Sequence, residues 1–84
     1  MTKEEVLELF NKNPTFNHLY KLFGLKGLVN TITMQRAMTS NVEMLPLHII
    51  MKNGISYFKN DEVNKLGIAY IYDLKNIPVE IINE

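Results

Sequence analysis

The sequence predicts one α+β domain of 84 residues, in which an N-terminal helical pair packs on a four- to five-stranded, mostly antiparallel sheet with a short inserted helix. Three observations predict this class. Helix-start patterns begin two segments before residue 24, an Asn-Gly pair separates two apolar runs at mid-chain, and runs rich in Ile, Val and Tyr follow. A chain of this length builds a single hydrophobic core, so residues 1–84 are predicted to form one domain.

The composition is that of a globular protein, with 46% hydrophobic and 21% charged residues. The chain has no cysteine, which excludes a disulfide framework and a thiolate metal site. No apolar run has the length of a membrane span, and acids stand where a signal peptide needs bases, so we expect a cytoplasmic protein. The abundance of Asn, Lys and Ile indicates AT-rich coding DNA and suggests a phage or mobile-element origin.

The first predicted helix covers about residues 3–11. Thr2 and Glu5 form a T-x-x-E capping box, in which the hydroxyl and the carboxylate each satisfy a backbone donor at the start of a helix. The acids of the first turn also lie near the positive end of the helix dipole.

A second helix is predicted to start at Asn13 and Pro14, which suit the N-cap and first helical positions. Gly24 suits a left-handed stop after it. Between them, four apolar residues have the spacing of one helix face, and they are Phe16, Leu19, Tyr20 and Phe23. Two short helices bury such a face only against another element, which we expect to be a sheet.

Residues 47–59 predict a β-hairpin, because Asn53 and Gly54 both tolerate the positive φ of a type I′ turn. The resulting register pairs Lys52 with Ile55, Ile50 with Tyr57 and His48 with Lys59. The opposite face of this hairpin carries mainly apolar residues and is expected to be the drier one; its members are Leu47, Ile49, Met51, Ser56 and Phe58.

The segment after the hairpin is expected to form one or two helical turns from residue 60 or 61 to a stop at Gly67. Residues 68–72, IAYIY, then predict a strand, because they combine β-branched and aromatic side chains. A turn over residues 73–76 leads to a last strand at 77–82. Pro78 has no amide to donate, so it should lie at a sheet edge or at the start of the strand.

Residues 25–38 allow two interpretations, and the strand is favoured because apolar and polar residues alternate and Val-Thr-Ile-Thr content suits a pleated surface. As a recognition helix, the same stretch would follow Gly24 as the turn glycine, with the hairpin as a wing. The usual spacing then requires apolar residues at Asn30 and Thr33, and neither is apolar.

The alternative function is therefore a DNA-binding, winged-helix-like regulator. Residues 9–42 carry four bases and no acid, although the net charge of the whole chain is zero. Residues 61–68, DEVNKLGI, resemble the opening of helix-turn-helix modules in excisionase-like regulators, but the following AYIYDLKN is strand-like. On this reading the DNA-contacting residues are Lys21, Lys26, Thr31, Thr33 and Arg36.

The favoured function is a non-enzymatic protein-binding regulator or inhibitor. His18 and His48 lie on different predicted elements with no ligand partners at metal spacing, so no metal, cofactor, small-molecule substrate or membrane is predicted. Tyrosines on strands suit an interface, because each gives a large contact area with a polar tip. We therefore predict a protein partner or a homodimer, bound through Ile50, Ile55, Tyr57, Tyr70 and Tyr72.

Overall fold

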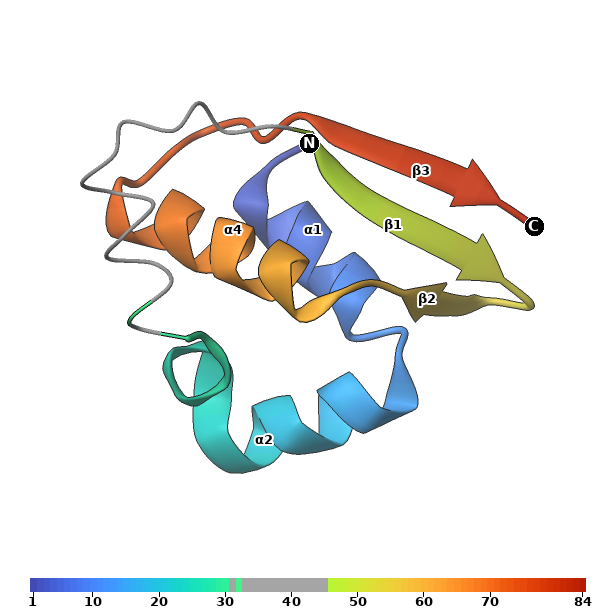
Figure 1. Cartoon of the computed structure of the whole chain (residues 1–84), viewed down its shortest axis with the longest axis horizontal. Helices are drawn as coiled ribbons and strands as arrows, with labels where there is room; N and C mark the ends of the chain where they lie inside the picture. The colour runs from blue at the N-terminus through green and yellow to red at the C-terminus, as the bar shows by residue number, and fades with distance from the viewer. Residues whose placement is uncertain (31, 33–45) are drawn as a thin grey trace.

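The computed structural model describes residues 1–30, 32 and 46–84. Their elements are α1 (Lys3–Phe10), α2 (Pro14–Leu28), β1 (Leu47–Lys52), β2 (Ile55–Tyr57), α4 (Asn60–Ile71) and β3 (Val79–Asn83). The sheet order is β2-β1-β3, with β2 antiparallel and β3 parallel to β1 (Figure 1). The class is α+β, as predicted. The described residues show three strands in a mixed sheet, in place of four to five mostly antiparallel ones.

Both predicted helix starts are confirmed. The Thr2 hydroxyl accepts from the Glu5 N–H at 3.1 Å, and the Thr2 N–H donates to the Glu5 carboxylate at 2.9 Å, which completes the capping box. Asn13 is the N-cap of α2, where its side-chain oxygen accepts from the Phe16 N–H at 3.0 Å. Pro14 follows at the first helical position, where no N–H is needed.

Gly24 bends α2 instead of ending it. Its φ of 70° is positive, as expected for a stop, but the helix resumes and continues to Leu28. The strand predicted within residues 25–38 is therefore wrong at its described positions: Leu28 is helical, Ile32 is helical, and 29–30 form no strand. The rest of that stretch, residues 31 and 33–38, lies outside the described residues.

The hairpin is confirmed. Asn53 and Gly54 have φ of 53° and 77°, and the register pairs Lys52 with Ile55 and Ile50 with Tyr57. The predicted pair of His48 with Lys59 does not form, because β2 ends at Tyr57 and the chain turns into α4. The His48 N–H donates instead to the carboxylate of Glu62, at 3.0 Å, so a side chain of α4 replaces the missing strand partner.

The predicted strand at residues 68–72 is wrong, because α4 continues through Gly67 to Ile71. A helical stripe spaced i, i+3, i+4 and i+7 faces the rest of the protein and consists of Val63, Leu66, Gly67 and Tyr70. The stop lies further on, at Asp73, whose φ is 50°. The Leu74 N–H donates to the Ala69 carbonyl at 2.9 Å, which is the 6→1 bond of a Schellman motif.

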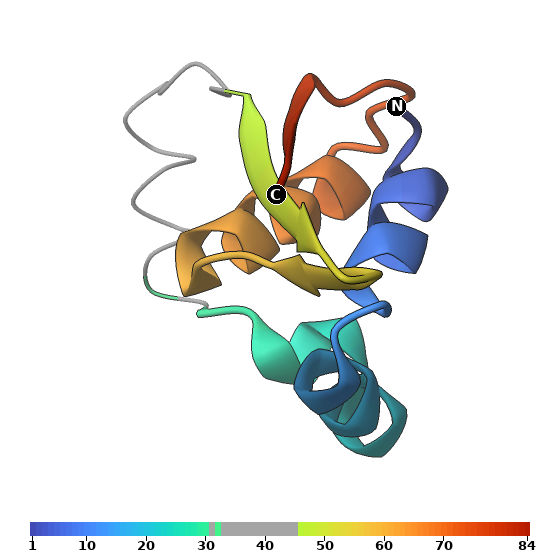
Figure 2. The same ribbon diagram turned by 90° about the vertical axis from the view of Figure 1, so that its right-hand side faces the viewer.

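The core lies between the sheet and a layer formed by α1 and α4, and Figure 2 shows the strands in front of α4. Phe10 of α1 is fully buried, stacks on Phe58 at 4.1 Å between ring centroids and meets Phe16 edge-on. The sheet contributes Leu47 and Ile49, both fully buried. Thus α1 and α4 cover the sheet, whereas α2 of the predicted helical pair packs mainly against α4.

Strand β3 begins directly after Pro78, as predicted for a proline at a strand start. The Pro78 carbonyl accepts from the Leu47 N–H at 2.9 Å and opens the parallel ladder. Just before it, Ile77 exchanges two backbone bonds with Met1, which places the start of α1 beside the start of β3. Among the described residues, no helix combines the length and apolar content that crossing a bilayer requires.

Candidate functional site

Among the described elements, no helix layer covers one face of the sheet, and we name it the uncovered face. The pleat places alternate residues on it, because successive side chains of a strand point to opposite sides. Its members are His48, Ile50 and Lys52 of β1, Ile55 and Tyr57 of β2, and Glu80 and Ile82 of β3. Each of them is exposed or half-buried, whereas Leu47, Ile49 and Ser56 on the opposite face are fully buried.

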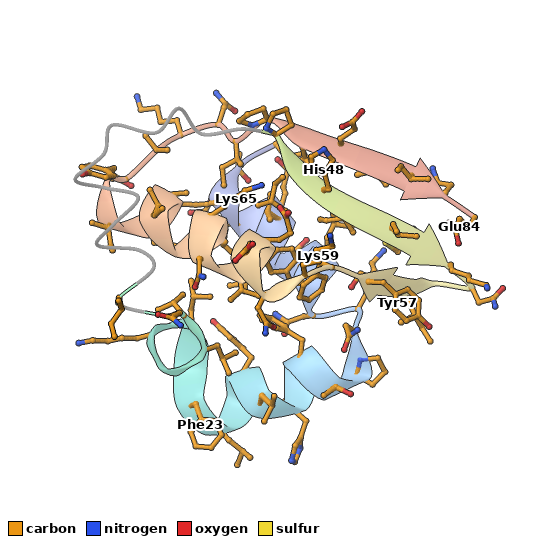
Figure 3. All side chains as sticks on the ribbon, in the orientation of Figure 1. Phe23, His48, Tyr57, Lys59, Lys65 and Glu84 are labelled. Atoms are coloured by element: carbon orange, nitrogen blue, oxygen red, sulfur yellow. The ribbon has the colours of Figure 1, made fainter. Side chains whose placement is uncertain are left out.

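The centre of the uncovered face is an apolar row that crosses all three strands. Ile50 is paired with Tyr57 on one side and with Ile82 on the other, so these three side chains lie next to one another across the sheet. Tyr57 is 46% exposed and Ile82 is 49% exposed. Ile55 extends the row along β2, and Figure 3 shows Tyr57 beside that strand. Solvent therefore reaches a continuous apolar strip.

Charged groups flank this strip. His48 Nε2 lies 2.8 Å from Glu80 Oε2 across the parallel pair, and both side chains are more than half exposed. Lys52 at the end of β1 is exposed, as is Lys59 just before α4 (Figure 3). On the uncovered face, Lys52 thus lies on one side of the row along β1, and the contacting pair of His48 and Glu80 lies on the other.

Three of the five predicted partner-binding residues, Ile50, Ile55 and Tyr57, meet on this face. Their grouping follows from the type I′ turn, which fixes the hairpin register. Ile82 was not predicted, because its place depends on the parallel pairing of β1 with β3. In the sequence, the alternation of apolar and polar residues in IPVEII, residues 77–82, was the signal that indicated one face of β3.

Tyr70 and Tyr72 do not belong to the uncovered face, because both lie at the end of α4. Tyr70 instead lines an apolar cavity of about 490 Å³ between helices, together with Leu7, Tyr20, Leu25, Lys26, Val29, Gly67 and Ile71. Burial raises the pKa of the Tyr70 hydroxyl, and the nearby Glu4 carboxylate raises it further. Tyr72 is 55% exposed and forms the C-cap of α4.

The residues of the DNA-binding alternative are not assembled by the described structure. Lys21 and Lys26 are exposed on α2, on either side of the bend at Gly24. Leu22 and Phe23 beside them are 62% and 61% exposed, and Figure 3 shows Phe23 pointing away from the other helices. This surface is therefore largely apolar. Thr31, Thr33 and Arg36 lie outside the described residues.

The two histidines are far apart in the fold, with His18 on α2 and His48 on β1. Within the described part of the chain, no group of three or more His, Asp or Glu residues has the geometry to hold a metal ion. His48 and Glu80 lie on the open sheet surface, and neither lines the cavity beside Tyr70. The uncovered face therefore offers contact area and flanking charge, which are the properties of a binding surface.

Comparison of the chain with protein-family models, with curated proteins and with solved structures gives no significant match.

Proposed function

We propose that this chain is a small cytoplasmic, non-enzymatic regulator or inhibitor that binds another protein on the uncovered face. The observation that carries the proposal is the apolar row formed by Tyr57, Ile50 and Ile82 in adjacent register, beside half-buried Ile55. On β1 and β2, fully buried residues lie one position away from the row, at Ile49 and Ser56, so these two strands are tightly packed on their other face. Covering it removes apolar surface from water, which drives association.

The flanking charges define the partner further. Lys52 lies beside the row at the hairpin end of β1, so a matching protein surface has an apolar centre and a carboxylate at that end. At the other end of β1 the row is followed by His48 and Glu80, whose side chains contact each other at 2.8 Å. Tyr57 is the main anchor, because an aromatic ring with a polar tip contacts apolar and wet surfaces together.

The test compares two tyrosines of similar exposure. Tagged wild-type protein and the Tyr57→Ser and Tyr72→Ser variants are used to capture partners from nuclease-treated lysate of the native host. The captured protein is then purified and titrated against each variant by calorimetry. We expect Tyr57→Ser to weaken binding and Tyr72→Ser to leave it unchanged, because Tyr72 lies outside the uncovered face.

Salt and nuclease separate this proposal from DNA binding. Replacing Lys52 and Lys59 should reduce the association rate and its dependence on salt, because flanking charges steer the encounter. Binding that disappears with nuclease, or a purified complex that Tyr57→Ser leaves at full affinity, would contradict the proposal. Circular dichroism of each variant confirms that the fold is retained.

A further inference from the structure

Strand β3 is an edge strand whose outward backbone groups have no partner among the described residues. The sheet order places β3 at one margin, and Figure 1 shows it as the upper border of the sheet. In a parallel ladder, residues bonded to the neighbouring strand alternate with residues whose N–H and C=O point away. The Pro78 carbonyl and the Glu84 N–H both bond to β1, so the backbone groups of the even-numbered residues point toward β1. Val79, Ile81 and Asn83 therefore direct their backbone groups outward.

The opposite margin of the sheet is protected. Strand β2 has three residues, and its Ser56 carbonyl accepts from the Asn13 side-chain amide at 2.8 Å. Short strands and covering groups are the usual means by which proteins prevent pairing at an edge. Strand β3 has five residues and no covering group from the described part of the chain, and two of its side chains, Ile81 and Ile82, are 39% and 49% exposed. The two edges thus differ in their capacity to accept another strand.

We propose that β3 pairs with β3 of a second copy of this chain, antiparallel and across a two-fold axis at Ile81. The outward backbone groups of β3 belong to odd-numbered residues, so in an antiparallel pair an odd-numbered residue of one copy must lie opposite an odd-numbered residue of the other. The two-fold axis then passes either through an odd-numbered residue or through the even-numbered residue between two of them. Centring on Glu80 sets the two Glu80 carboxylates directly opposite each other. Centring on Ile82 sets Glu80 opposite Glu84. Like charges in that position are destabilising.

The register centred on Ile81 avoids both conflicts and uses the whole strand. It places Ile81 on Ile81, Val79 opposite Asn83, and Glu80 opposite Ile82, so that no two carboxylates face each other. All three outward residues of each copy exchange backbone hydrogen bonds. The two sheets then join into one of six strands, and the two uncovered faces lie on the same side of it. The pairing concerns the strand edge and holds whether or not the uncovered face binds another protein.

Proline substitution separates edge pairing from folding. Ile81→Pro removes an outward N–H that β1 does not use, so we expect a monomer whose urea midpoint equals that of the wild type at protein concentrations where the wild type is also monomeric. Ile82→Pro removes an N–H that faces β1 and should lower the midpoint. Sedimentation of the wild-type chain across micromolar concentrations should show a monomer–dimer equilibrium. A wild-type chain that stays monomeric throughout would overturn the proposal, as would an Ile81→Pro variant that dimerises as well as the wild type.

Cysteine cross-linking tests the register, since the chain has no cysteine of its own. Ile81→Cys should form a disulfide-linked dimer on mild oxidation, because opposed residues of this kind lie about 5.5 Å apart between Cα atoms. Val79→Cys alone should not, because the two copies of residue 79 are displaced by four residues, or about 14 Å. A mixture of Val79→Cys and Asn83→Cys should cross-link. Efficient linkage of Val79→Cys alone, or loss of the dimer on Tyr57→Ser but not on Ile81→Pro, would overturn this register.

Discussion

On strand β1, Leu47 and Ile49 are fully buried beneath helices, whereas His48 and Ile50, their neighbours along the same strand, face away from the helix layer. Both faces of β1 carry an isoleucine, Ile49 on the buried face and Ile50 on the uncovered face. The difference therefore arises from which face α1 and α4 reach, and not from the apolar character of the residues. One face of this small sheet therefore stabilises the fold, and the other leaves an apolar strip in contact with solvent.

The largest effect is expected when alanine replaces an aromatic residue beneath the sheet and, in a second variant, an aromatic residue on the uncovered face. Phe10→Ala should lower the free energy of unfolding by about 3–5 kcal/mol, because the buried ring stacks on Phe58 and leaves a cavity. Tyr57→Ala, at a 46% exposed side chain, should cost about 1 kcal/mol or less. Urea unfolding measures both. Equal losses would show that the two faces do not differ as described.

A second prediction concerns the bond between α4 and β1. The Glu62 carboxylate is nearly buried, accepts from the His48 N–H and pairs with Lys65 at 3.2 Å. Glu62→Ala should destabilise the fold by about 1–3 kcal/mol, because it leaves that N–H without its acceptor. Glu62→Gln keeps an acceptor oxygen and should cost less. If both variants unfold at the same urea concentration, the hydrogen bond does not hold the helix layer to the strand.

A third prediction tests the turn from which both faces derive their register. Gly54→Val should destabilise the fold by about 1–2 kcal/mol, because a β-branched residue fits poorly at a φ of 77°. Asn53→Gly is the matched control and should be nearly silent, since glycine accepts the φ of 53° at that position. An unchanged melting temperature for Gly54→Val would mean that the hairpin does not depend on this turn.

The smallest expected effect is at acid pH, where α1 begins. Hydrogen bonds from Thr2 hold the pKa of Glu5 below its usual value, and the ammonium of Lys3 lowers the pKa of Asp73 in the same way. A carboxyl group whose pKa is lower in the folded than in the unfolded state stabilises the fold at pH values above its unfolded pKa. This contribution is lost as the pH falls through its folded pKa. Stability should thus decline below about pH 4, and less so in Glu5→Gln and Asp73→Asn. Acid unfolding curves identical to that of the wild type would contradict this assignment.

Local signals in the sequence were sufficient where a few neighbouring residues determine the structure. The capping box at Thr2, the start of α2 at Asn13 and the turn at Asn53 each depend on contacts within four residues. The strand predicted at residues 68–72 was wrong for the opposite reason. The β-branched and aromatic side chains of this segment favour a strand, but packing of α4 on α1 and β1 keeps residues 68–71 helical.

The same distinction explains the candidate site. Ile50, Ile55 and Tyr57 could be grouped because the hairpin turn sets their register. Tyr70 and Tyr72 were assigned to one strand face, but two residues apart on a helix they point in nearly opposite directions. The position of Ile82 depends on the parallel pairing of β3 with β1, two strands that α4 separates in the sequence. No short-range sequence pattern determines which strand β3 pairs with.

The hydrogen bond from the Asn13 amide to the Ser56 carbonyl limits how far a sheet of this protein can grow. A strand layer that is open at both margins adds copies indefinitely, and its natural end product is a fibre. Within the described residues, addition at β3 uses the open margin of both copies and leaves the guarded β2 strands outermost. In the proposed dimer, assembly would then end as a closed pair, and one asparagine at a helix joint would favour a finite complex over polymerisation.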